Sequence, residues 1–230
     1  KLFCKVCVLF SLFSAKAQDG GISEWRYHIP YQQGLAIADA GSYVYCASEL
    51  GMYYFSKIDN SVNRVTRIQG LSDIGITDIA HNSDEDIVIV AYANGNIDLI
   101  LGEEVVNMED LKRANFPGSK RINSITMRNE LAYLSCGFGI LVINLEKQEV
   151  KETIRLNTNG DLGVNDVVFH NGLFYAATNE GLFFANESSN NLSDPNEWTL
   201  TGELPDSTFS SVFILNQILH ANYDNKTFNS

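Results

Sequence analysis

Short apolar runs of four to seven residues recur along the chain, and they are separated by Gly, Asn, Asp and Ser. Aromatic and β-branched residues dominate these runs, and no stretch of a dozen residues keeps the apolar period of an amphipathic helix. Runs of this length and composition, bounded by turn-forming residues, are typical of strands. The pattern therefore predicts an all-β protein.

Four segments share one pattern, in which an apolar strand leads through a short glycine-containing turn into a second apolar strand: 44–55, 88–99, 132–143 and 174–185. Successive turn glycines are 44, 44 and 42 residues apart, and a fifth copy would place an asparagine at the same position. A tight turn needs a residue that tolerates positive φ, which glycine does best and asparagine next. The predicted turn positions are Gly51, Gly95, Gly139, Gly181 and Asn225.

Each copy also carries a small residue four places before its turn residue, as expected for a strand packed at a crowded axis. These residues are Ala47, Ala91, Ser135 and Ala177, with Ala221 in the fifth copy. An earlier strand with an apolar–polar–polar–apolar core occurs at 76–79, 122–125 and 164–167. Repeats of this length with about four strands are typical of propeller blades. We predict a β-propeller of four-stranded blades with about 42–44 residues per repeat, incomplete at four blades plus part of a fifth.

The N-terminal residues 1–17 have the features of a Sec signal peptide, with Lys1 and Lys5 before a short apolar run and small residues at the cleavage site. Residues 18–230 would then form the mature propeller, exported to the periplasm or outer-membrane surface without a membrane span. Residues 22–30 are expected to close the ring as an outer strand. Because the repeat stops in mid-blade, we expect the natural protein to continue.

Charge and cysteine content narrow the function. The formal charge is −12 for the whole chain, and −15 for residues 18–230, since the first 17 residues contain three lysines and no acid. A nucleic-acid role is disfavoured because phosphate binding needs a basic surface. Cys46 and Cys136 lie at different places within their repeats, so we expect two unpaired, buried thiols.

No arrangement of residues typical of catalysis or metal binding is found in the sequence, so we predict no catalytic residues, no metal ligands and no cofactor. Propeller geometry instead places the turns between second and third strands on one face, together with the blade-to-blade connections. Side chains there are candidates for contact with a partner protein or glycan, although turn formation alone also explains the same Asn and Gly residues. The candidates are Glu49, Asn94, Asn96, Phe138, Asn179 and Glu180.

Four segments carry a family resemblance: Gly34-Leu-Ala-Ile-Ala-Asp-Ala-Gly41, Gly70-Leu-Ser-Asp-Ile-Gly-Ile76, Ala91-Tyr-Ala-Asn-Gly-Asn-Ile-Asp-Leu99 and Gly137-Phe-Gly-Ile-Leu-Val-Ile-Asn144. Over residues 24–230 the chain resembles the N-terminal β-propeller of the PorZ family. The resemblance implies a component of the type IX secretion system of Bacteroidota that helps the sortase complex attach cargo at the outer-membrane surface. The implied partners are other secretion-system proteins or anionic lipopolysaccharide.

The leading hypothesis is therefore a non-catalytic binding and scaffold propeller in type IX secretion. The Gly-Leu-Ser-Asp segment also fits the wider class of two-component-regulator propeller repeats. The alternative is thus a periplasmic ligand-sensing propeller of a hybrid two-component regulator. A polysaccharide lyase or hydrolase on a propeller is the weakest hypothesis, because no acid/base pair is found.

Overall fold

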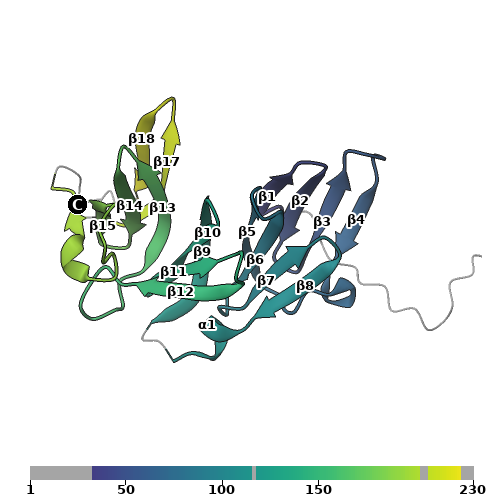
Figure 1. Ribbon diagram of the computed structural model, residues 1–230, viewed down its shortest axis with the longest axis horizontal. Coiled ribbons are helices and arrows are strands. Elements are labelled where there is room, and N and C mark those ends of the chain that lie inside the picture. The colour runs from purple at the N-terminus through teal and green to yellow at the C-terminus, as the bar shows by residue number, and fades with distance from the viewer. Residues whose placement is uncertain (1–32, 116–117, 203–206, 224–230) are drawn as a thin grey trace, which may run out of the picture.

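The computed structural model describes residues 33–115, 118–202 and 207–223. Within these ranges the chain forms four antiparallel sheets of four strands each, followed by a two-stranded hairpin. The sheets follow one another side by side along an open arc from the N-terminal to the C-terminal part (Figure 1). The all-β propeller predicted from the repeat is confirmed, as an arc of blades that is not closed.

Each sheet is an up-and-down meander and is called a blade here. Blade 1 comprises β1 (Ala36–Ala40), β2 (Tyr43–Ser48), β3 (Gly51–Ser56) and β4 (Val62–Val65). Blade 2 comprises β5 (Ile76–Asn82), β6 (Ile87–Tyr92), β7 (Ile97–Leu101) and β8 (Glu104–Met108). Blade 3 comprises β9 (Ser119–Arg128), β10 (Leu131–Gly137), β11 (Gly139–Asn144) and β12 (Glu149–Ile154). Blade 4 comprises β13 (Val164–His170), β14 (Leu173–Thr178), β15 (Gly181–Asn186) and β16 (Thr199–Leu200). The hairpin comprises β17 (Phe209–Leu215) and β18 (Ile218–Tyr223).

Three short helical segments lie in the connections between strands: η1 (Arg67–Gln69), α1 (Asp110–Arg113) and η2 (Pro195–Glu197). Thr66 caps η1 and Asp194 caps η2 by accepting backbone N–H groups, so side chains satisfy donors that these short turns leave open. None of the helices in the described ranges is long and apolar enough to cross a bilayer.

The hydrophobic core lies between the blades. One buried cluster joins each pair of neighbours: blades 1 and 2, blades 2 and 3, blades 3 and 4, and blade 4 with the hairpin. Leu99 of blade 2 and Leu134 of blade 3, for example, belong to one cluster and are both fully buried. The two faces of a strand are therefore both apolar in the middle of the arc, which explains why β6 reads as one continuous buried run.

The predicted turns connect the second and third strands of all four blades. Glycine adopts positive φ at Gly95 (82°), Gly139 (137°) and Gly181 (141°), whereas Gly51 is not among the positive-φ glycines. In blade 2 the turn is one residue longer, because Tyr92 pairs with Asn96 and Gly95 lies within the loop. The small residues predicted near the axis are fully buried: Ala47, Ala91, Ser135 and Ala177.

In the fifth copy, the strand pairing shifts the alignment of the repeat by one residue from the one predicted. Asn222 pairs with Ser211 across the same β-bulge by which Ala177 pairs with Asp166. Asn222, not Ala221, therefore holds the position of the small residues. Asn225, the predicted signal peptide and the predicted closing strand at 22–30 lie outside the described residues.

Of the four cysteines, Cys46 and Cys136 lie within the described residues, and both are unpaired, as predicted. Cys136 is buried in the cluster between blades 2 and 3, and burial raises the pKa of its thiol to about 12. Cys46 is only partly buried, so the expectation of two buried thiols holds fully for Cys136 alone.

The first strands of the blades and of the hairpin, called the inner strands here, lie next to one another around the arc: β1, β5, β9, β13 and β17. Polar side chains at a recurring β-bulge of β5, β9 and β13 contact the next inner strand. Asn123 Nδ2 donates to the Val164 carbonyl of the next blade at 2.7 Å, and Asn165 Nδ2 donates to the Phe209 carbonyl at 2.8 Å. The Asp78 carboxylate accepts the Ile125 N–H at 2.8 Å in the same manner. These side chains satisfy backbone groups that a free inner edge would leave open. We call this set of contacts the inner-strand clasp.

Candidate interaction face

The turns between second and third strands lie beside the connections that lead into the next blade. The Glu49 carbonyl accepts the N–H groups of Gly75 (2.8 Å) and Ile76 (2.9 Å), where blade 2 begins. The Asn179 carbonyl accepts the Thr208 hydroxyl at 3.2 Å, just before the hairpin. These contacts place both kinds of loop on one face, as the sequence predicted. We call it the turn face, comprising 49–50, 73–75, 93–96, 137–138 and 179–180.

Four of the six candidate residues are exposed on the turn face: Glu49, Asn94, Asn179 and Glu180. The prediction is wrong for Asn96 and Phe138, whose exposed fraction is 0%. Phe138 packs into the cluster between blades 2 and 3. Asn96 turns inward because the longer turn of blade 2 puts it opposite Tyr92, where its Oδ1 accepts Asn107 Nδ2 at 3.0 Å. Neither side chain is available to a partner.

Asn94 is fixed in place by an ion pair beside it. Its Nδ2 donates to Asp73 Oδ2 at 2.6 Å, and Lys112 Nζ contacts the same oxygen at 2.9 Å. Burial raises the pKa of Asp73, but the hydrogen bonds from Lys112 and Asn94 outweigh it and hold that pKa below its ordinary value. Asn94 Oδ1 in turn accepts the Asn96 N–H at 3.0 Å. The turn of blade 2 is thus tied to the connection that enters the blade and to α1.

A buried carboxylate, that of Asp98, also binds the connection that enters blade 2. Asp98 is fully buried and accepts the Ser72 N–H (2.8 Å), the Tyr92 hydroxyl (2.6 Å) and Asn107 Nδ2 (2.8 Å). Burial raises the pKa of Tyr92, and the hydrogen bond to Asp98 raises it further. Sequence reasoning missed this network, although an aspartate within the apolar run Ile97–Leu101 was a signal. The network fixes the backbone at Ser72, next to residues 73–75 of the turn face.

Asn179 is positioned by the inner-strand clasp. Asn165 Nδ2 donates both to Asn179 Oδ1 at 3.0 Å and to the Phe209 carbonyl at 2.8 Å. The turn of blade 4 is therefore tied to the start of the hairpin.

Two large apolar side chains are exposed on the turn face. Leu50 (40% exposed) follows Glu49 in the turn of blade 1, and Ile74 (50% exposed) precedes Gly75, whose N–H the Glu49 carbonyl holds. Sequence reasoning did not select them, although an apolar residue within a turn is unusual. Apolar side chains with a polar surround are typical of protein–protein contact surfaces.

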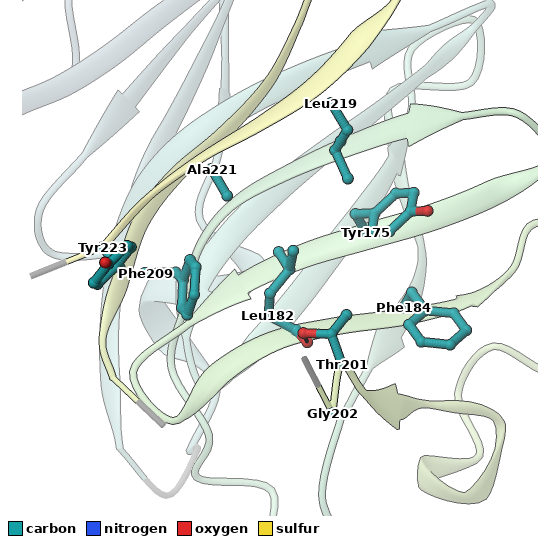
Figure 2. A pocket seen from close by; sticks show the side chains of 9 residues that line it. All are labelled: Tyr175, Leu182, Phe184, Thr201, Gly202, Phe209, Leu219, Ala221 and Tyr223. Carbon is teal, nitrogen blue, oxygen red and sulfur yellow. Dashed lines mark hydrogen bonds between the residues drawn. The ribbon is translucent and has the colours of Figure 1, made fainter. Parts of the chain in front are cut away.

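An apolar pocket of about 500 Å³ lies between blade 4 and the hairpin. Figure 2 shows its lining side chains from both sheets: Tyr175, Leu182, Phe184, Thr201, Gly202, Phe209, Leu219, Ala221 and Tyr223. The matching residues of blade 3 are packed against blade 4 in a buried cluster: Tyr133, Ile140 and Val142. The pocket thus continues the core between blades, and its lining among the described residues is free of charged side chains.

Within the described ranges, no group of three or more His, Cys, Asp or Glu side chains is arranged to hold a metal ion. The carboxylates of the turn face are separated or paired, as Asp73 is with Lys112. The arrangement is suited to contact with another molecule through hydrogen bonds and apolar packing.

Comparison with known proteins gives a family. The family model for the N-terminal β-propeller domain of PorZ matches residues 44–199, more than half of the chain. No curated protein sequence matches the chain significantly.

Solved structures agree on the fold. PorZ, described as an essential bacterial surface component of the type IX secretion system of Porphyromonas gingivalis, superimposes with a TM-score of 0.70 and 24% identity over 81% of this chain and 25% of that chain. The extracellular domain of a protein from B. thetaiotaomicron, described as a one-component system, gives a TM-score of 0.66 and 12% identity over 83% and 26%. A second structure of the extracellular domain of that protein, described as a hybrid two-component system, gives a TM-score of 0.59 and 13% identity over 77% of this chain and 24% of that chain.

The chain spans about a quarter of the length of these structures, and likeness at such low identity concerns the fold alone. The family model is more specific, because it covers the turn between the second and third strands in all four blades and the first strands of blades 2, 3 and 4. The chain belongs to the family of N-terminal β-propeller domains of PorZ, a protein of the type IX secretion system.

Proposed function

We propose that this chain is a non-enzymatic binding and scaffold propeller of a cell-surface component of the type IX secretion system. The family match supports the secretion role, and the P. gingivalis relative is described as a surface component essential to that system. Export through a Sec signal at residues 1–17 and a propeller domain spanning 18–230 are part of the same proposal.

The observation that carries the binding role is the construction of the turn face. Its turns are tied to the next blade by backbone and side-chain hydrogen bonds, at Glu49, Asn94 and Asn179. Exposed groups held in a fixed geometry lose little conformational freedom on binding, so they support affinity better than mobile loops. Leu50 and Ile74 supply an apolar centre, and Glu49 supplies part of the polar surround.

The partner we propose for this face is a secretion-system protein. Glu49 and Glu180 are exposed there, and the chain has a formal charge of −12. Like charges disfavour contact with anionic lipopolysaccharide at this surface. The sensing alternative rests on likeness to extracellular domains at 12–13% identity, which concerns the fold only.

A photo-cross-linking amino acid placed in the full-length protein in its host tests the binding role. We expect cross-links from Glu49 and Glu180 to another protein of the secretion system, identified by mass spectrometry. Lys147 is the control, because it is exposed in the turn between β11 and β12, on the opposite face. The Leu145 N–H of that turn donates to the Glu130 carbonyl of the turn between β9 and β10, so these two turns lie together at the other end of the blade. Cross-links to secretion proteins from Lys147 alone, or from none of the three positions, would contradict the proposal.

A further inference from the structure

One chain of hydrogen bonds crosses three inner strands and ends in the hairpin. Asp78 accepts the Ile79 N–H at 2.9 Å within blade 2 and the Ile125 N–H at 2.8 Å in blade 3. Ser124, the residue before Ile125, donates its hydroxyl to Asp166 Oδ1 of blade 4 at 3.1 Å. Asp166 Oδ2 accepts the Val212 N–H of the hairpin at 3.0 Å. Two carboxylates thus join four consecutive inner strands.

Neither carboxylate has a cationic partner among the ion pairs of the described residues. The neighbouring strands present neutral groups to Asp78: Ala91 of β6 lies opposite it, and the Ile125 N–H of β9 donates to it. The charged residues on β1 and β9 are engaged elsewhere or point to solvent. Asp39 pairs with Lys57, Lys120 contacts the Lys112 carbonyl, Arg121 is exposed, and Arg128 pairs with Glu187. The charged group that acts on Asp78 is Asp166, which repels it.

Apart from Asp78, the described groups around Asp166 are likewise neutral, since Ser124 of β9, Ala177 of β14 and Val212 of β17 contact or oppose it. Burial raises the pKa of Asp78 to about 6, against the opposing effect of its two backbone hydrogen bonds, and the Asp166 charge adds to the rise. Burial also raises the pKa of Asp166. Both residues are half-buried, so an ionised carboxylate without a counter-ion loses part of its hydration there and is disfavoured.

We propose that the inner-strand clasp is tightened by acid: protonation of Asp78 holds blades 2 and 3 together more firmly, and its ionisation loosens the contact between β5 and β9. Because the folded pKa lies above the unfolded value of 3.8, the folded state binds a proton that the unfolded chain has already released. The stabilising contribution is therefore full below pH 3.8 and is lost as pH rises through about 6. A separation of about two pKa units corresponds to a change of about 100-fold in the opening equilibrium.

Hydrogen exchange of the full-length protein, read by mass spectrometry on peptides covering 119–128, tests this. After correction for the intrinsic exchange rate, we expect about 25-fold more opening of β9 at pH ~7.5 than at pH ~4.5 in the wild type, because the unfolded chain has already released most of this proton at pH ~4.5. Asp78→Asn should lose most of this pH dependence, because the amide does not titrate. Asp84→Asn, in the exposed turn after the same strand, should keep it. A pH dependence unchanged in Asp78→Asn, or greater protection at neutral pH in the wild type, would overturn the proposal.

A direct titration of the Asp78 carboxyl carbon by NMR in the wild-type protein covers the case in which Asp78→Asn fails to fold. A midpoint near 6 agrees with the proposal, whereas a midpoint near the ordinary value of 3.8 would refute it. The proposal concerns the contacts between blades and stands independently of the partner at the turn face.

Discussion

Gly139→Ala is expected to destabilise the protein by about 3 to 5 kcal/mol, as the combined cost of a strained φ and a steric clash in a packed region. Gly139 has a φ of 137°, and a Cβ there would lie 2.3 Å from the Ile154 carbonyl oxygen. That oxygen belongs to the backbone of β12, so the added methyl group can fit only if the outer strand moves away from β11. The loss would be a large part of the stability of a typical domain. Denaturant unfolding followed by circular dichroism measures it.

Variants at two other glycines separate the cost of the strained φ from the cost of the steric clash. Gly172 also has positive φ, but a Cβ there meets nothing within 4 Å, so Gly172→Ala should cost only about 1 to 2 kcal/mol. At Gly181 the Cβ would clash with the end of the Leu200 side chain, which can move. Gly181→Ala should therefore fall between them. Equal losses at Gly139 and Gly172 would show that the turn of blade 3 is not built as described.

Phe174→Ala is expected to destabilise the protein by about 3 to 5 kcal/mol, because it removes a fully buried aromatic side chain and leaves a cavity. The Phe174 ring stacks on Phe169 with centroids 4.0 Å apart and an interplanar angle of 8°. Its centroid lies 5.4 Å from that of the Tyr133 ring and 5.3 Å from that of the Trp198 ring. The Phe174 ring therefore joins blade 3, blade 4 and the connection before β16.

Phe213→Ala is the matched control, since Phe213 is an aromatic residue on the hairpin that is 40% exposed. Its removal should cost less than about 1 kcal/mol, in line with surface substitutions and a partial loss of contact. Denaturant unfolding of both variants gives the comparison. A loss at Phe174 no larger than at Phe213 would contradict a core located between the blades.

The sequence predicted the blades because turn chemistry and axial crowding act on single residues. Gly95, Gly139 and Gly181 need positive φ, and Ala91 and Ala177 have no room for a larger side chain. Both constraints limit the residue types that can occupy these positions, so the same types recur at a fixed spacing. The alternation within strands was less informative, since the middle blades are covered on both faces.

The direction of side chains within the turns was not predictable in the same way. Asn96 and Phe138 occupy loop positions that suggest exposure, yet they face the core. In blade 2 the reason is a turn lengthened by one residue, a detail set by the pairing of Tyr92 with Asn96. The same one-residue uncertainty misplaced Ala221, since a bulge in β17 determines which residue of β18 reaches the axis.

The hydrogen bonds between blades could not be predicted from the sequence. The motif around Asp78 and Asp166 showed two polar residues between apolar ones, but not that a bulge turns the carboxylates toward the next inner strand. Those contacts join residues 47 and 46 positions apart, so no local pattern reports them. The buried network of Asp98 depends in the same way on Ser72, 26 residues earlier.

The measurement that tests the central claim most directly is a secretion assay in the native host with charge-reversed full-length protein. We expect Glu49→Lys combined with Glu180→Lys to reduce secretion and surface attachment of cargo, because both charges lie on the turn face. Glu146→Lys combined with Glu149→Lys makes the same change in charge at exposed positions of the opposite face and should leave secretion unchanged. Normal secretion with the turn-face variant, at wild-type protein levels, would contradict the assignment of this face to partner binding.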